Sequence, residues 1–91
     1  MWLVRQKKSV LKSIQKLPVV VLDTLDFLIG ELENDGPYRH GWPNYGKLGG
    51  EKYHCHLKKG KPTYVACWEI LDKNSKIMEV YYVGTHEKAP Y

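Results

Sequence analysis

Apolar residues recur with a helical period in the first third of the chain and with a period of two in its second half. Val10, Ile14 and Leu17 are spaced at i, i+4 and i+7, which predicts a first helix over residues 6–17. The proline that follows ends this helix and suits the first turn of a second one over residues 19–33. Because almost nothing joins the two helices, we expect them to form an antiparallel hairpin.

The second half predicts a small antiparallel sheet, with turns rich in Gly, Pro, Asp, Asn and Lys between its strands. The connection over residues 34–51 is rich in glycine and proline and is expected to be a long loop, a kind of segment that is often functional. The sequence therefore predicts a single α+β domain over residues 1–91, with an N-terminal helical hairpin packed on the sheet. The strands are expected at residues 2–4, 52–58, 63–71 and 77–83.

The strand over residues 52–58 has two chemically different faces. His54 and His56 point the same way and lie about 6.5–7 Å apart along the strand. Neutral imidazoles move protons near pH 7 and ammonium groups attract phosphate, so this face suits a phosphodiester. The alternative is an ordinary exposed strand with its polar residues outward. One face carries Tyr53, Cys55 and Leu57, and the other carries Lys52, His54, His56 and Lys58.

Charge and cysteine usage limit the class of protein. The formal net charge of +4 permits a nucleic-acid partner without demanding one. Cys55 and Cys67 do not form a CxxC motif, and Arg5 interrupts any secretory hydrophobic segment. We therefore expect free thiols in a reducing cytoplasm. No apolar run approaches the ~20 residues of a membrane span, so no membrane partner is expected.

Aromatic and basic residues share the long loop. Arg39, Trp42 and Tyr45 could contact RNA there, because aromatic rings beside cations stack on unpaired bases. The alternative is that Trp42 and Tyr45 fold back to cover the edge of the core.

Taken in order, the segments KSVLKSIQKLP, VLDTLDFLIGELENDGP, GKLGGEKYHCHL and EVYYVGTHEKAPY resemble the RelE/ParE superfamily, the toxins of bacterial type II toxin–antitoxin systems. GTH followed five residues on by a terminal aromatic is most similar to the YafQ branch. The resemblance implies a metal-independent, ribosome-associated mRNA endoribonuclease (an mRNA interferase) that inhibits translation. It also implies a cognate antitoxin protein, mRNA and the ribosome as partners, and no cofactor.

The resemblance also implies site residues. His54 and His56 stand where RelE has two strand lysines, His86 stands at the catalytic tail histidine of YafQ-type toxins, and Tyr91 is the terminal aromatic. An arginine that RelE has near its third strand has no equivalent here. Neighbouring lysines are candidates for holding the phosphate instead. The expected catalytic residues are His54, His56, His86 and Tyr91, and the expected substrate-binding residues are Lys52, Lys58, Lys59, Lys61, Arg39, Trp42 and Tyr45.

Other function classes remain open. His54, His56 and either Cys67 or His86 could supply three zinc ligands, although the neighbouring lysines would repel a cation. A ParE-like toxin would act on gyrase without cutting RNA. A structural or interaction domain without nuclease activity is the third alternative.

Overall fold

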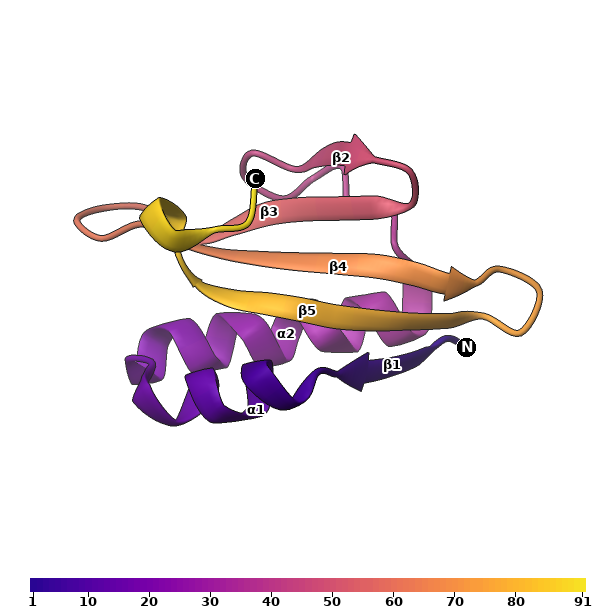
Figure 1. Ribbon diagram of the computed structural model, residues 1–91, viewed down its shortest axis with the longest axis horizontal. Helices are drawn as coiled ribbons and strands as arrows, with labels where there is room; N and C mark the ends of the chain where they lie inside the picture. The colour runs from indigo at the N-terminus through magenta and orange to yellow at the C-terminus, as the bar shows by residue number, and fades with distance from the viewer.

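Five strands form one mixed sheet, with two α-helices on one of its faces, in a computed structural model that describes all residues from 1 to 91 (Figure 1). The strand order is β1-β5-β4-β3-β2. β1 runs parallel to β5, and the other neighbours are antiparallel. The elements are β1 (Leu3–Gln6), α1 (Lys8–Ser13), η1 (Ile14–Lys16), α2 (Val19–Asp35), β2 (Gly46–Gly49), β3 (Lys52–Lys58), β4 (Tyr64–Asp72), β5 (Ile77–Thr85) and η2 (His86–Lys88), where η marks a 3-10 helix.

The α+β class is confirmed, but the expectation of a wholly antiparallel sheet is wrong. Leu3 pairs with Ile77 and Gln6 with Val80 in the parallel sense, so the first strand lies beside the last one. Alternation of side chains reveals which faces a strand buries, and it does not reveal the direction in which the strand runs. That direction is fixed here by tertiary bonds, such as the one from the Leu3 N–H to the carbonyl of Lys76 at 2.9 Å.

α2 forms because its apolar residues make one continuous stripe. Val21, Leu25, Leu28 and Leu32 follow the helical period, and all four are buried. The helix ends at Gly36, whose φ of 92° is a conformation that residues with a Cβ avoid. The N–H of this glycine donates to the Leu32 carbonyl and completes the last turn.

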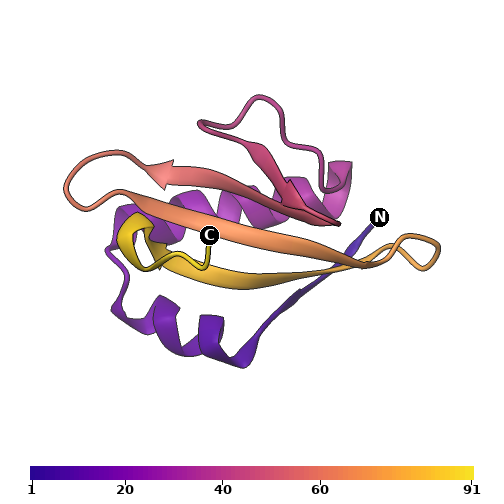
Figure 2. The same cartoon turned by 45° about the horizontal axis from the view of Figure 1, so that its top comes forward.

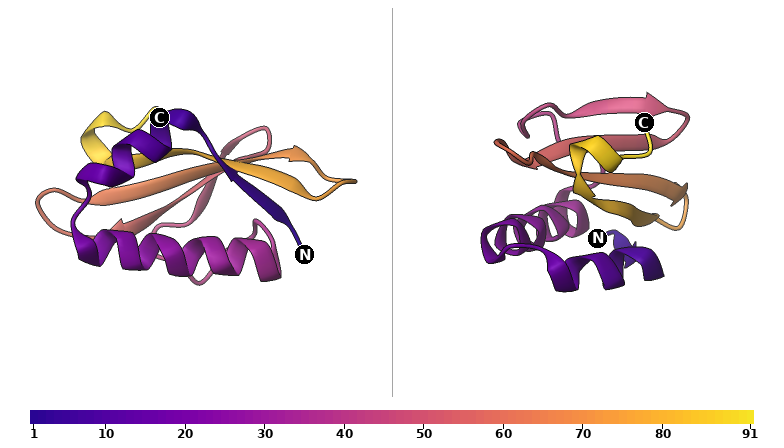
Figure 3. Two further views of the ribbon diagram at one scale, coloured as in Figure 1. Left: turned by 90° about the horizontal axis from the view of Figure 1, so that it is seen from below. Right: turned by 60° about the vertical axis from the view of Figure 1, so that its left-hand side comes forward.

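α1 is shorter than the predicted helix over residues 6–17. The residues before it extend into β1, and the residues after it tighten into the 3-10 turn η1 ahead of Pro18. Val10 is the only buried residue of α1. α1 packs against β5 and α2 against β3 and β1, so both helices lie beneath the same face of the sheet (Figure 3).

The prediction of an unstructured loop over residues 34–51 is wrong for residues 46–49. These residues form β2, which pairs antiparallel with β3 and sets Gly46 opposite His54. The sequence of β2 is GKLG, and two glycines in four residues leave no alternation by which a strand could be predicted.

The main core lies between the sheet and α2. Trp68 of β4 is fully buried at its centre, and its Nε1 donates to the Pro37 carbonyl at 3.1 Å. The opposite face of the sheet is also covered, because Val65 and Cys67 pair with the two β3 histidines and are fully buried outside that core. The C-terminal residues lie in front of β4, while α2 passes behind the sheet (Figure 2). None of the helices combines the length and the apolar character needed to cross a bilayer.

Candidate active site

The predicted two-faced character of β3 is confirmed. Tyr53 and Cys55 are buried in the core, whereas His54 and His56 are half-buried on the opposite face of the sheet. Alternation along a pleated strand therefore puts both imidazoles on the face that the helices leave free.

The C-terminal segment brings two further rings to these imidazoles. The ring centroids of His56 and His86 lie 5.4 Å apart, edge to face. The Tyr91 ring lies 4.7 Å from that of His54 and 5.8 Å from that of His86. The four side chains expected to be catalytic thus form one cluster, which we call the histidine cluster (His54, His56, His86 and Tyr91).

Two hydrogen bonds fix the position of His86. Its backbone N–H donates to the carbonyl of Thr63, the residue before β4, at 2.8 Å. One residue earlier, the Thr85 carbonyl accepts a hydrogen bond of 2.7 Å from the Tyr82 phenol. The backbone at the tail histidine is therefore tied to the residue before β4 and, through Thr85, to a side chain of β5.

Gly46 makes room for His54. A Cβ on this glycine would lie 3.1 Å from the Nε2 of His54, tighter than an ordinary van der Waals contact. Gly46 was not predicted as a site residue, because nothing along the chain indicates that β2 pairs with β3.

Burial and neighbouring charges shape the titration of the β3 histidines. Burial lowers the pKa of His54 below its ordinary value, and His56 and His86 lower it further. Burial likewise lowers the pKa of His56, with contributions from His86 and Lys59. Both imidazoles are consequently neutral at pH 7 and able to accept a proton. Burial raises the pKa of Tyr91, which keeps its phenol protonated.

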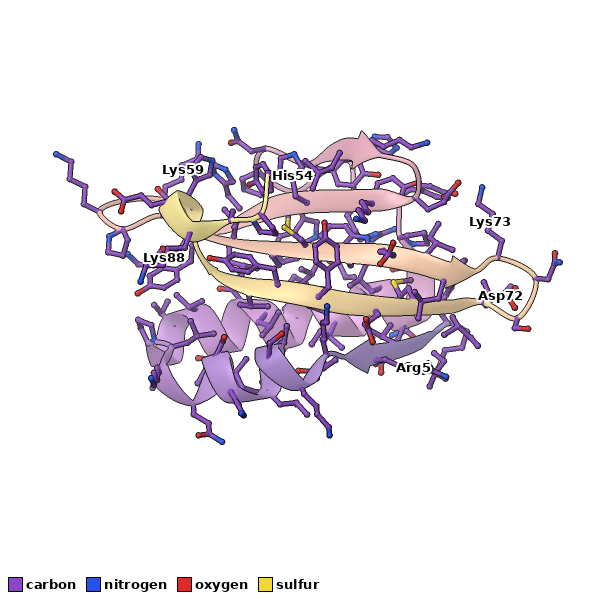
Figure 4. The ribbon with its side chains drawn as sticks, in the orientation of Figure 1. Arg5, His54, Lys59, Asp72, Lys73 and Lys88 are labelled. Carbon is purple, nitrogen blue, oxygen red and sulfur yellow. The ribbon has the colours of Figure 1, made fainter.

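An open groove of about 580 Å³ adjoins the histidine cluster between the β3–β4 turn and η2. His56, His86 and Lys61 are among the residues that line it. Lys58, Lys59 and Lys61 are exposed, and the ion pairs of the structure involve none of them. Lys59 and Lys88 lie at the η2 end of the sheet, whereas Asp72 and Lys73 lie at the far end (Figure 4).

Lys52 lies further along β3, with its Nζ 5.6 Å from the ring centroid of Tyr81. It is exposed on the same face as the histidines and also forms no ion pair. Four lysines expected to bind substrate are therefore free to do so.

The three loop residues expected to bind substrate are engaged elsewhere. Arg39 pairs with Glu31 of α2 at 3.0 Å, and the Nε1 of Trp42 donates to the same carboxylate at 2.9 Å. Tyr45 stacks on Tyr53 with ring centroids 6.1 Å apart. Trp42 and Tyr45 thus cover the edge of the core, as the structural alternative predicted, and lie on the helix side of the sheet, away from the histidine cluster.

The structure groups no three His, Cys, Asp or Glu side chains closely enough to hold a metal ion. Cys67 lies opposite His54 in the sheet register but is fully buried. Burial raises its pKa to about 12, which keeps the thiol protonated, whereas zinc binds the thiolate. The zinc alternative therefore has no ligand set.

The arrangement can hold an anion, accept a proton at one imidazole and return one from another, all on a single face of the sheet.

Comparisons of the chain with protein-family models, with curated proteins and with solved structures find no match.

Proposed function

We propose that this chain is the toxin of a bacterial type II toxin–antitoxin system, with a RelE/ParE-like fold, and that it cleaves mRNA at the ribosome without a metal. One observation carries the proposal. Residues from the middle and the end of the sequence converge as the histidine cluster, within 4.7–5.8 Å between ring centroids, beside lysines that have no acidic partner.

The cleavage step is an internal transesterification. A neutral imidazole of His54 or His56 takes the proton of the 2′-hydroxyl as its oxygen attacks the adjacent phosphorus. The bond from phosphorus to the 5′ oxygen breaks, and His86 gives that oxygen a proton. The products are a 2′,3′-cyclic phosphate and a 5′-hydroxyl. The reaction balances in atoms and electrons without an oxidant, a metal or a cofactor.

Cations stabilise the charge that develops on the phosphorane. Lys59 and Lys61 stand on the turn beside the groove and carry no competing ion pair. Donors that meet the developing charge in a partly desolvated site lower the barrier more than the same donors in water. The Tyr91 phenol, protonated and next to His54 and His86, stacks on a base or donates to the phosphate.

The same proposal includes a partner and a compartment. An acidic, initially disordered antitoxin segment complements the exposed lysines and masks the histidine cluster. The protein works in the cytoplasm, where the ribosome is and where the buried thiols of Cys55 and Cys67 stay reduced.

The test is cleavage of a translated message in the presence of ribosomes and excess chelator. We expect cleavage to persist, to leave a 2′,3′-cyclic phosphate and to follow a bell-shaped pH profile. His86→Ala should lower the rate by about 10²–10⁴, the usual contribution of a general acid or base. The matched control is His40→Ala, which removes an exposed imidazole that contacts Tyr45 outside the cluster.

Two results would overturn the proposal. Chelator-sensitive cleavage that leaves a 5′ phosphate would mean that metal-activated water is the nucleophile. A folded protein that cuts no RNA beside ribosomes but inhibits gyrase would instead be a ParE-like binding toxin.

A further inference from the structure

The groove beside the histidine cluster contains one group that phosphate binding does not explain. Glu87, the second wall residue from η2, contributes a carboxylate to a groove otherwise lined by imidazoles, an ammonium group and neutral residues. Its side chain forms none of the hydrogen bonds or ion pairs of the structure. A negative charge here weakens the attraction of every phosphate, so its presence calls for a compensating role.

A structural role does not supply one. The 3-10 helix η2 is a single turn of three residues, too short for its dipole to demand an acidic residue. Glu87 is exposed and directly precedes Lys88, yet the two side chains do not pair. The carboxylate is therefore free to accept hydrogen bonds from a molecule in the groove.

We infer that the groove holds a nucleobase next to the scissile phosphate and that Glu87 makes the site selective for guanine. This inference rests on the proposed function, because it assigns the specificity of the same site. The base lies between the β3–β4 turn and η2, while its phosphate remains at His56 and His86.

The size of the groove fits this occupant. About 580 Å³ lies within the range of ligand pockets and accommodates one nucleotide, whereas a duplex would not enter it. Pro62 supplies an apolar surface for the face of a base. The Thr63 hydroxyl already donates to the Gly60 carbonyl at 2.9 Å and accepts from the Gly60 N–H at 3.3 Å, which leaves the carboxylate as the dominant acceptor among the side chains of the groove.

The choice of guanine follows from the chemistry of the carboxylate. An ionised carboxylate only accepts hydrogen bonds, through two oxygens side by side. Guanine alone among the four bases presents two adjacent donors on one edge, N1–H and the N2 amino group. Adenine and cytosine place an acceptor beside their amino group, and uracil flanks its single N–H with two carbonyls. Single-stranded RNA offers these Watson–Crick edges for readout.

The test measures binding without cleavage, so that it does not depend on activity. The probes are short single-stranded oligonucleotides with 2′-deoxyribose at the reactive position, which removes the nucleophile, and with each of the four bases in turn on either side of one phosphate. We expect the wild-type chain to bind the guanine probe more tightly than the others by about 5- to 150-fold, the discrimination of a good bidentate contact.

Glu87→Gln provides the sharpest variant. A glutamine amide presents one acceptor and one donor, a pair that each of the four bases can match on its Watson–Crick edge, so the preference for guanine should be lost. Losing one negative charge also strengthens phosphate binding to every probe equally. Glu69→Gln on β4 is the matched control, because it removes the same charge from the histidine face of the sheet, outside the groove, and should leave the order of the four bases unchanged.

The outcomes separate the two proposals. Equal affinity for all four probes, or a guanine preference that survives Glu87→Gln, would overturn the inference even if the chain cleaves RNA. Guanine-selective binding that Glu87→Gln abolishes would support it even if the cleavage assay failed, and that failure would count against the nuclease alone.

Discussion

Gly84 sets the position of the tail histidine, and replacing it by alanine should disturb both stability and activity. A Cβ at this position would lie 2.7 Å from the Oη of Tyr82 and 3.0 Å from its Cζ. The first distance is shorter than side-chain contacts tolerate and the second is at the limit, so the phenol must move. Its movement breaks the hydrogen bond to Thr85, the residue before His86.

The cost follows from these contacts. Overpacking costs about 1–3 kcal/mol and a lost hydrogen bond about 0.5–1.5 kcal/mol. Alanine regains about 0.4–1 kcal/mol by restricting the unfolded chain. We therefore expect Gly84→Ala to lower the free energy of unfolding by roughly 1–3 kcal/mol, measured by urea denaturation. The cleavage rate should fall as well, because His86 loses one of its two anchors.

A double-mutant cycle isolates the cause. Tyr82→Phe removes the oxygen that clashes and the hydrogen bond that would be lost, so Gly84→Ala should cost at least about 1 kcal/mol less in that background. The control is Gly30→Ala in α2, where a Cβ would meet nothing within 4 Å and should stabilise the helix by about 0.5–1 kcal/mol. Strict additivity of Gly84→Ala and Tyr82→Phe would refute this account of the tail.

Three further predictions concern the histidines and the cysteines. His54→Ala and His56→Ala should each lower the cleavage rate. The double variant should raise the activation free energy by less than the sum of the two single increases, because the imidazoles share one substrate. Additive increases would contradict a shared site. Folding lowers the pKa values of both imidazoles, so below about pH 6.5 the unfolded chain binds more protons than the folded one. The free energy of unfolding should therefore fall between pH 7 and 5.5. Urea titrations that show a rise over this range would refute the direction of the shifts. Burial raises the pKa of Cys55 and Cys67 to about 12, so neither thiol should react with a thiol reagent until denaturant is added, and fast labelling of the native protein would contradict their burial.

The local parts of this fold could be predicted from the sequence because they depend on periodicity. The stripe through Val21, Leu25 and Leu28 identifies α2, and the alternation around His54 and His56 identifies both faces of β3. The same alternation explains why the two imidazoles were expected to act together.

The remainder depends on tertiary pairing, which a single sequence does not display. Nothing along the chain shows that β1 pairs with β5, or that Gly46 lies against His54. Trp42 could equally have covered the core or faced solvent, and the partner that decided between them, Glu31, lies on another element. Glu87 was not predicted as a site residue for the same reason, because most of the residues that make up the groove around it are distant in the sequence.

The parallel pairing of β1 with β5 has a kinetic consequence. Leu3 belongs to the first strand and Ile77 to the last, so their contact closes most of the chain as one loop. Such non-local contacts require a loss of chain entropy on loop closure before they contribute stability, and proteins rich in them fold slowly. The β3–β4 and β4–β5 hairpins close much shorter loops. We therefore expect the hairpins, which carry the histidine face, to form the folding nucleus, and the N-terminal strand to dock after it.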